Sequence, residues 1–330
     1  MLKAAEASGA RRCLITGGTG YAGSWISRHL ALRGHDAIAV SRSGWKTAPG
    51  FPCACLTADL EKESPQSLVR LFADKTDLIV HAAALTDASL PDYPRRSLLA
   101  NALGTRNILE ALRLRYNDTP EEAPLLVYCS TVHVYGISEG KISERTPPAP
   151  GNDYALTHLF AEEYCRMFAR LHALRCIILR FCNGYGAPAR AGGANWSLLL
   201  NDLCKSAMSE TLLLRSDPRT QRDFLWLGDF AAVIEALIPR KDLAGRVFNV
   251  SYGKSLSIGE VARRVAKIAS RLSGRKVKIQ TGHSGTRGRA KRLRVSNRAL
   301  LSETGLVFTD HLDEEIEAIL LQLEESGAAS

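Results

Sequence analysis

The sequence predicts an α/β protein with a doubly wound parallel sheet and a smaller mixed α/β lobe toward the C-terminus. Three observations predict this class. Short apolar runs alternate with helical segments through about residue 182, a glycine-rich loop joins the first run to the first helical segment, and the alternation loosens beyond residue 182. We therefore assign the sheet to residues 1–182 and the smaller lobe to 183–330, and we expect the chain to return to the sheet near 246–252.

The expected strands of the first half are short apolar runs. They are RCLIT (12–16), DAIAVS (36–41), PCACLT (52–57), DLIVHAA (77–83), PLLVYCS (124–130) and RCIILRF (175–181). Helical segments follow the first run up to Arg33 and lie near 65–73, 95–116 and 153–172. Alternation of this kind is typical of parallel strands joined by crossover helices.

Beyond residue 182 the expected strands are shorter and are mixed among helices. They are TLLLR (211–215), DFLWL (223–227), RVFNVS (246–251) and KVKIQ (276–280). This pattern predicts the second, smaller lobe. A chain of 330 residues with 45% apolar content can bury the core that two lobes need.

The composition argues against a membrane protein and against a disulfide-bonded one. No run reaches the ~18 apolar residues of a membrane helix, and the N-terminal residues lack the apolar stretch of a signal peptide. The eight cysteines are scattered and form no C-x-x-C pair. We therefore expect reduced thiols, no metal site, no membrane contact and a cytoplasmic location.

The formal net charge of +9 is unevenly placed, because residues 271–298 contain ten Lys and Arg and no Asp or Glu. Such a stretch can bind nucleic acid, bind a small phosphorylated ligand or form a solvated face. It contains His283 but no Phe, Tyr or Trp on which bases could stack. We therefore expect no nucleic-acid partner, and a phosphate-binding role and a solvated face stay open as alternatives.

The loop LITGGTGYAG (14–23) is a candidate dinucleotide site. Gly18, Gly20 and Gly23 have the spacing G-x-G-x-x-G, and Gly17, Gly20 and Gly23 fit the related G-x-x-G-x-x-G. The loop leaves an expected strand and opens an expected helix. Glycines there let the backbone turn tightly and approach a pyrophosphate at the helix N-terminus.

The end of the second expected strand distinguishes the two nicotinamide cofactors. An acid about 20 residues beyond the glycine loop usually holds the ribose 2′-hydroxyl of NAD, whereas an arginine accommodates the 2′-phosphate of NADP. Here the strand ends with Ser41, Arg42 and Ser43, and the nearby acid Asp36 lies at its start. The sequence therefore favours NADP(H) over NAD(H). Asp59, after the third strand, either hydrogen-bonds the adenine amino group or caps a helix.

A tyrosine and a histidine open the expected helix at 153–172. Tyr154 and His158 are four residues apart, which places both side chains on one face of a helix. Such a pair can be a catalytic arrangement or a packing contact between helices.

With these features in order, the sequence resembles the extended short-chain dehydrogenase/reductase superfamily, in its nucleotide-sugar epimerase/dehydratase/reductase branch. The landmarks are TGGTGYAG (16–23), ADL (58–60), HAAA (81–84), NALGT (101–105), STVHVYG (130–136), Tyr154, LRFCNGYGAP (179–188), QRDFLWLGD (221–229) and FNVSYGKSLSIGE (248–260). The resemblance implies an NADP(H)-binding Rossmann domain over 1–182 and, over 183–330, mainly a lobe that binds a nucleotide-diphosphate sugar.

The resemblance also implies roles for individual residues. Tyr154 would be the general acid/base, Thr131 would hydrogen-bond the same substrate oxygen, and His158 would complete the catalytic set. The implied cofactor contacts are Gly17, Gly20, Tyr21, Ala22, Gly23, Ser41, Arg42, Ser43, Asp59, Leu60, Ala82, Ala83, Ala84, Asn101, Tyr154 and His158. The implied substrate contacts are Ser130, Thr131, His133, Asn183 and the arginines Arg222, Arg289 and Arg292, which suit a diphosphate.

Two departures from the family pattern bear on the reaction. Val132 and His133 stand where the proton-abstracting dehydratases carry an acidic pair, so 4,6-dehydration lacks its usual base. His133 could replace that base or could be a structural hydrogen-bonding group. His158 stands where the family has the lysine of Tyr-x-x-x-Lys, which holds the nicotinamide ribose and lowers the tyrosine pKa. Histidine can still donate to the ribose, but near neutral pH most of its charge is gone.

We therefore expect NADPH-dependent reduction of a keto group, at C4, on a nucleotide-linked 6-deoxysugar. The alternatives are a 4-epimerase that retains its NAD(P) and a non-catalytic NADP(H)-binding protein. We also expect a homodimer through the helices near 95–116 and 153–172. The apolar residues expected at that interface are Leu156, Leu159, Phe160, Met167, Phe168 and Leu171.

Overall fold

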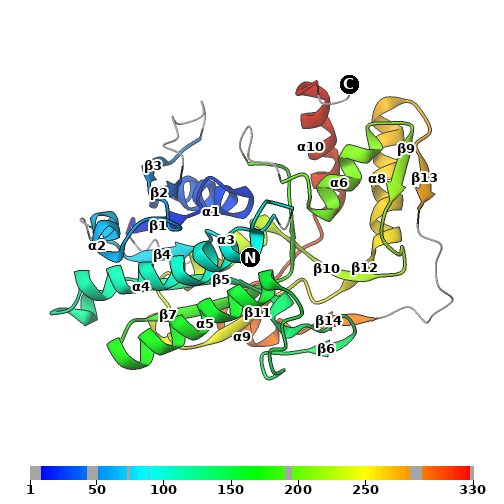
Figure 1. The fold of residues 1–330 in the computed structure, drawn as a ribbon. Coiled ribbons are helices and arrows are strands. Elements are labelled where there is room, and N and C mark those ends of the chain that lie inside the picture. The colour runs from blue at the N-terminus through cyan, green and yellow to red at the C-terminus, as the bar shows by residue number, and fades with distance from the viewer. Residues whose placement is uncertain are drawn as a thin grey trace.

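The computed structural model describes residues 9–42, 51–72, 75–87, 89–189, 195–282 and 292–327. Its central element is a seven-stranded sheet in the order β11-β7-β5-β4-β1-β2-β3 (Figure 1). The strands are β1 (Arg12–Thr16), β2 (Asp36–Ser41), β3 (Ala54–Thr57), β4 (Leu78–His81), β5 (Leu125–Thr131), β7 (Cys176–Phe181) and β11 (Val247–Val250). Every neighbouring pair is parallel, so the predicted doubly wound sheet is confirmed.

Helices cover both faces of this sheet. They are α1 (Tyr21–Leu32), α2 (Pro65–Leu68), α3 (Tyr93–Ser97), α4 (Gly104–Arg115), α5 (Asp153–His172), α7 (Leu227–Leu237) and α9 (Arg298–Thr304). Cys13 and Ile15 of β1 lie in one core with side chains of α1 and α7, whereas Leu14 lies in another with side chains of α4 and α5. The central strands β1, β4 and β5 are buried on both faces, which is why they are largely apolar runs in the sequence, whereas the edge strand β3 is mostly exposed.

Two of the predicted helices are built from several segments. The helix expected near 95–116 is α3, a π-helical segment over Leu98–Leu103 and then α4. The helix expected near 65–73 is α2 followed by a 3-10 turn over Val69–Phe72. Further 3-10 turns lie at Pro120–Glu122, Val132–Tyr135 and Lys241–Leu243.

A lobe with its own apolar core lies beside the sheet, on the right of Figure 1. Its helices are α6 (Leu199–Ala207), α8 (Ile258–Ser273) and α10 (Leu312–Glu325). Three strands pair in the order β12-β10-β8, which are Ser255–Ser257, Gln221–Trp226 and Asn183–Tyr185. Two parallel pairs complete the described strands, β9 (Thr211–Leu214) with β13 (Lys278–Thr281), and β6 (Gly140–Ile142) with β14 (Leu293–Val295).

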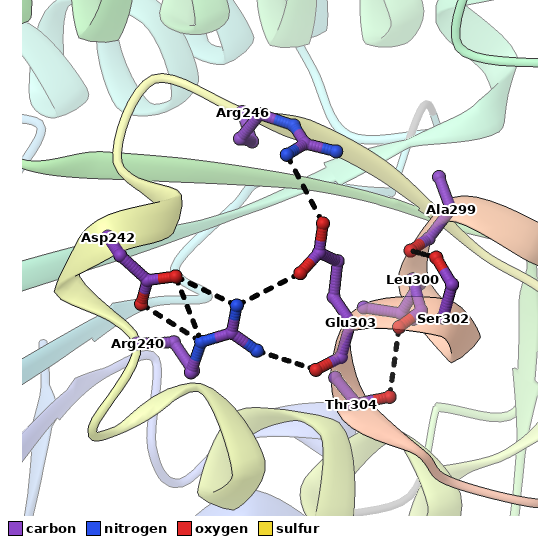
Figure 2. A network of polar contacts seen from close by, with 8 residues as sticks. All are labelled: Arg240, Asp242, Arg246, Ala299, Leu300, Ser302, Glu303 and Thr304. Carbon is purple, nitrogen blue, oxygen red and sulfur yellow. Dashed lines mark hydrogen bonds and ion pairs between the residues drawn. The ribbon is translucent and has the colours of Figure 1, made fainter.

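The chain crosses between the lobe and the sheet more than once. It returns to the sheet through α7 and β11, which pairs with β7, and again through α9. Figure 2 shows how α9 is held there: the Glu303 carboxylate lies between Arg240 (2.9 Å) and Arg246 (3.3 Å), and Arg240 also pairs with Asp242 (2.8 Å). Leu300 of the same helix is fully buried in the core on the α1 and α7 side of the sheet.

Three chemical features of the described residues bear on the predictions above. All eight cysteines are free thiols, and all of them except Cys55 are buried. No described helix combines the length and the apolar character that crossing a bilayer requires. No cluster of His, Cys, Asp and Glu side chains suited to a metal ion occurs in the part of the chain that the structure describes.

Candidate active site

A cavity of about 860 Å³ lies where the C-terminal ends of the central strands face the lobe. Its wall is formed by the loop after β1, the end of β2, the loop after β4, the end of β5, the first turns of α5, and residues at the start of α6. β1 and β4 are neighbours from which the chain proceeds to opposite halves of the sheet. Ligands of doubly wound proteins bind at this switch point, and cavities of ~300–1,000 Å³ suit small molecules and cofactors.

Most of the predicted site residues line this cavity. They are Gly17, Gly20, Tyr21, Ala22, Gly23, Ser41, Arg42, Leu60, Ala82, Ala83, Ala84, Thr131, His133, Tyr154, His158 and Asn183. Five predicted residues are described but do not line it, namely Asp59, Asn101, Ser130, Arg222 and Arg292. Ser43 and Arg289 lie outside the described residues.

The glycine loop has the shape of an anion cradle. Gly17 has a φ of +68°, and a Cβ atom there would lie 2.8 Å from the backbone of Ala83. A Cβ atom on Gly23 would lie 2.0 Å from the carbonyl oxygen of Gly17, so α1 can approach β1 this closely only because Gly23 has no side chain. Gly20 caps α1 without a side-chain hydrogen bond, and the first turn contains no acid. The backbone N–H groups of that turn are therefore free to bind a phosphate.

The end of β2 supplies the residues expected to select the cofactor. Ser41 is largely buried and Arg42 is exposed, and both line the cavity next to the glycine loop. Arg42 makes no ion pair with any described residue. Asp36 lies at the opposite end of β2, where its carboxylate is 3.4 Å from Arg12. The wall at this point therefore has a cation and no carboxylate from β2.

Asp59 and Asn101 hold loops rather than lining the cavity. The Asp59 carboxylate accepts a hydrogen bond from the Glu61 backbone N–H (3.1 Å) within a turn, and the helix that follows, α2, is capped by Ser64 instead. The Asn101 side chain is buried, accepts from the Leu85 N–H (2.6 Å) and donates to the Leu85 carbonyl (3.1 Å) and to Thr157 (3.1 Å). It thus fixes the loop after β4 against α5.

Ser130 also points away from the cavity. Its hydroxyl donates to the Glu162 carboxylate (2.6 Å), and the same carboxylate accepts two hydrogen bonds from Arg180 (2.8 and 2.6 Å). All three side chains are buried, and Arg166 approaches the pair from the rim at 3.0 Å. Neighbouring residues of a strand face opposite sides, so Thr131 reaches the cavity and Ser130 reaches this interior ion pair.

Arg222 and Arg292, the two described arginines predicted for a diphosphate, lie apart from the cavity wall. Arg222 is partly buried on β10, and its charge acts on His133, which lines the cavity. Arg292 is exposed, and its carbonyl accepts from the Gly140 N–H (2.7 Å) at the end of the β6–β14 pair. Within the described part of the basic stretch, Arg271 pairs with Glu317 (2.8 Å), and no residue of that part lines the cavity.

Thr131 and Tyr154 meet at the cavity wall. Thr131 is the last residue of β5, and its hydroxyl accepts from the His133 N–H (3.2 Å), which starts the following 3-10 turn. The Asn152 side chain accepts from the Ala155 N–H (2.9 Å) and caps α5, which places Tyr154 in the first helical turn. Burial raises the pKa of Tyr154 to about 12, against the opposing effect of its hydrogen bond with Thr131. The phenol is therefore protonated near neutral pH.

His158 lies one turn beyond Tyr154, and the two rings meet edge to face with centroids 4.7 Å apart. Its Nδ1 is 2.7 Å from the phenol oxygen of Tyr128, a buried residue of β5. Its Nε2 is buried and has no hydrogen-bond partner among the described residues. Burial, with a smaller contribution from His133, lowers the pKa of His158 to about 3, so the imidazole is neutral. Where the family pattern has a cation, this site has a neutral ring.

The remaining contacts of the cavity join it to the lobe. The Tyr21 hydroxyl donates to the Gly186 carbonyl (2.5 Å), and Trp25 Nε1 donates to the Ala187 carbonyl (2.9 Å). Asn183 lines the cavity and donates to the Asp223 carbonyl (3.0 Å). These bonds fix α1 and the segment after β7 relative to each other, so both lobes contribute to one site.

Comparison with known proteins assigns the chain to a family. A model of the NAD dependent epimerase/dehydratase family matches residues 13–251. The chain belongs to this family. The matched segment includes the glycine loop, Thr131, Tyr154, His158 and Asn183.

Two curated members of the epimerase/dehydratase family and one solved structure show how similar the chain is to its relatives. The GDP-6-deoxy-D-mannose reductase of Pseudomonas aeruginosa is 27% identical over 268 residues, which are 78% of this chain and 80% of the relative. The UDP-glucose 4-epimerase of Azospirillum brasilense is 26% identical over 274 residues, 78% of this chain and 77% of the relative. The structure of RMD from Pseudomonas aeruginosa complexed with NADPH has a TM-score of 0.75 and 26% identity, and it covers 96% of this chain and 100% of that one.

A nicotinamide dinucleotide fits the site of this epimerase/dehydratase family member. The glycines at 17 and 23 let the loop pack closely against its neighbours, and the N-terminus of α1 beside it has no side-chain cap and no acid in its first turn. At the far side of the cavity, Nε2 of His158 is a buried polar atom that no described residue hydrogen-bonds. These two ends suit a long ligand with a pyrophosphate near α1 and a polar group near α5. Together with the family, they indicate an NAD(P)-dependent enzyme.

The sequence did not point to every residue that shapes this site. Tyr128, Glu162 and Arg180 have no motif, because their contacts join β5, α5 and β7 across many residues of chain. One signal was available: Glu162 lies four residues after His158 and eight after Tyr154, so it shares their helix face. An acid on the buried face of a helix indicates a buried partner.

Proposed function

We propose that this protein catalyses the NADPH-dependent reduction of a keto group, at C4, on a nucleotide-linked 6-deoxysugar. The observation that carries the proposal is the state of the Tyr154–His158 pair. The Tyr154 pKa is raised to about 12 and His158 is neutral, so the site holds a phenol that can give a proton. Reduction of a ketone needs this proton donor, whereas oxidation of an alcohol needs the phenolate as base.

In this proposal NADPH, when bound, supplies the hydride. Tyr154 and Thr131 hydrogen-bond the keto oxygen, and Tyr154 delivers its proton to that oxygen. His158 donates from Nε2 to the nicotinamide ribose. Ser41 and Arg42, which line the cavity beside the glycine loop, bind the 2′-phosphate and favour NADP(H) over NAD(H).

The substrate contacts belong to the same proposal. Asn183 and His133 line the cavity and lie within reach of a sugar or its phosphates. Arg222, with Arg289 and Arg292 from the basic stretch, provides guanidinium groups for a diphosphate. Of these residues, Asn183 and His133 line the cavity, whereas the described arginines Arg222 and Arg292 lie apart from its wall.

A 4-epimerase that retains NAD(P) is the second candidate, because the UDP-glucose 4-epimerase of Azospirillum brasilense is about as similar to the chain as the reductase of Pseudomonas aeruginosa. Dehydration is disfavoured because Val132 and His133 replace the acidic pair of the dehydratases. The neutral His133 imidazole is the base that a dehydratase built on this chain would have to use.

The deciding experiment incubates the protein with NADPH and a panel of GDP-, UDP-, dTDP- and CDP-linked 4-keto-6-deoxysugars and follows the loss of NADPH absorbance. A reductase consumes NADPH with at least one of them, and Tyr154→Phe abolishes turnover while NADPH still binds. Conversion of UDP-glucose to UDP-galactose without net NADPH consumption would instead identify an epimerase. Tight NADPH binding with no turnover of any nucleotide sugar would identify a non-catalytic binding protein.

We also propose that the chain forms a homodimer through α3, α4, α5 and the π-helical segment. Phe160 (43% exposed), Leu98 (46%) and Leu103 (40%) line a groove of about 530 Å³ on this face. Leu156 and Leu171 are also exposed, and Leu159 and Met167 are partly buried. Phe168, expected on the interface, is instead buried in the core between α5 and the sheet.

The cytoplasmic location stays a prediction, and the free thiols are compatible with it.

A further inference from the structure

The two ring nitrogens of His158 have different surroundings. Nδ1 lies 2.7 Å from the Tyr128 phenol oxygen, away from the cavity, and Nε2 is buried without a partner among the described residues. The His158 side chain is 3% exposed, and the residue lines the cavity. A neutral imidazole carries one proton, so the role of Nε2 depends on which nitrogen holds it.

The Tyr128 hydroxyl decides this question. The side chain is 1% exposed, and its bond to His158 is the one hydrogen bond that it makes with the described residues. Burial raises the pKa of Tyr128 well above its ordinary value, so the phenol keeps its proton. If Nδ1–H donated to the phenol oxygen, the buried O–H would be left without an acceptor, which is unfavourable. The O–H therefore donates to Nδ1, and the imidazole proton is on Nε2.

The polar groups that the structure places near this pair already have partners of their own. His81 of β4 is already held between Thr16 (2.5 Å) and Thr105 (2.9 Å). On α5 itself, Glu162 is occupied by Ser130 and Arg180 as described above, and Tyr154 is bonded with Thr131.

The charge state of His158 is equally well defined. Burial is the main cause that lowers the pKa of His158 to about 3, and His133, in the turn after β5, contributes in the same direction. Burial also lowers the pKa of His81 on β4 to about 3, so that ring is neutral as well. The His158 ring therefore stays neutral across the pH range in which enzymes of this kind are assayed.

We propose that Tyr128 is a positioning residue that fixes His158 as the Nε2–H tautomer, so that a neutral ring presents one N–H donor to a hydroxyl oxygen of the bound dinucleotide. The identity of that acceptor, the nicotinamide ribose, rests on the proposed function. The assignment of the tautomer does not rest on the proposed function. The site thus keeps the hydrogen bond of the family's lysine and gives up its charge.

The first test is nitrogen NMR of ¹⁵N-histidine-labelled protein without ligand, with His158 assigned by the loss of its signals in His158→Asn. We expect an unprotonated Nδ1 and a protonated Nε2, with shifts that do not change between about pH 5 and about pH 8. In Tyr128→Phe, the Nδ1–H form should become populated. A protonated Nδ1 in the unaltered protein would overturn the proposal, and this readout holds even if Tyr128→Phe does not fold.

The second test is the dissociation constant for NADPH by calorimetry. Tyr128→Phe should weaken binding about two- to fivefold, because part of the population loses the donor. Tyr135→Phe is the matched control, because its buried phenol also makes a 2.7 Å hydrogen bond, to Asn249, and the residue does not line the cavity. Equal weakening in both variants, or none in Tyr128→Phe, would refute the positioning role. If both tests give the expected results but the unaltered protein turns over no nucleotide sugar, only the proposed function is contradicted.

Discussion

Replacing His158 by lysine tests how the missing charge limits Tyr154. The two rings have centroids 4.7 Å apart. For the separation of an ammonium at position 158 from the phenol oxygen we take ~5 Å, within the ~4–6 Å over which an opposite charge lowers a pKa. At that distance and an effective dielectric constant of ~20, a phenolate and an ammonium attract by about 3 kcal/mol, equivalent to about two pKa units. The Tyr154 pKa of about 12 would then fall toward ~10.

The burial of the site reduces this gain. The same surroundings that lower the pKa of His158 to about 3 would also lower that of a lysine, by roughly three units, so that it is only partly charged near neutral pH. We therefore expect the phenolate population of Tyr154 to rise about ten- to a hundredfold near pH 8. The rate of sugar oxidation with NADP⁺ should rise with it. Reduction should change much less, because protonated Tyr154 remains the dominant form.

The assay is a spectrophotometric titration of phenolate absorbance, in which Tyr154→Phe in the same background isolates the signal of Tyr154. His158→Gln is the control, because it removes the imidazole without adding a charge and should leave the Tyr154 pKa near 12. An unchanged Tyr154 pKa in His158→Lys would refute the electrostatic reasoning. So would an equal fall in both variants, since only one of them adds a cation.

The remaining predictions concern the cofactor, the dimer and the interior ion pair. NADP(H) should bind at least about tenfold more tightly than NAD(H), a difference of about 1.4 kcal/mol, and calorimetry should show this preference disappear in Arg42→Ala. Light scattering at micromolar concentration should give a dimer mass that Phe160→Arg reduces to that of a monomer; a monomeric unaltered protein would disprove the interface. Glu162→Gln leaves the buried Arg180 unpaired, so it should lower the free energy of unfolding, measured in urea, by about 3–5 kcal/mol. The control, Glu163→Gln on the exposed face of α5, should change that free energy by less than about 0.5 kcal/mol.

The sequence was sufficient to predict the sheet because its central strands β1, β4 and β5 are buried on both faces. Each of the runs RCLIT, DAIAVS and RCIILRF became a strand with bounds within a residue of the run. Their order in the sheet follows from right-handed crossovers and from the reversal after β3. The π-helical segment over Leu98–Leu103 was not predictable, because its hydrogen-bond spacing leaves no periodic signal that differs from that of an α-helix.

The site was predictable to the extent that backbone geometry determines it. Gly17 and Gly23 are required by the close approach of backbones, and Tyr154 and His158 share a helix face by their spacing. The direction of a side chain in a loop or at the end of a strand is set by tertiary partners. Asp59 and Ser130 therefore matched the family's landmarks in sequence and yet turn toward Glu61 and Glu162.

The order in which the chain is synthesised matters for how this protein folds. Phe181 ends β7, but its sheet neighbour β11 begins only at Val247, after much of the lobe. α7 and α9, which cover the same sheet face, also come late, and Leu300 fills a core whose other members emerge first. A nascent chain that stops near residue 182 would expose an apolar sheet face and an unpaired β7 edge, both of which favour pairing with other chains. Contacts between segments so distant in sequence also form slowly, so we expect the sheet to be completed only after β11 and α9 have been synthesised.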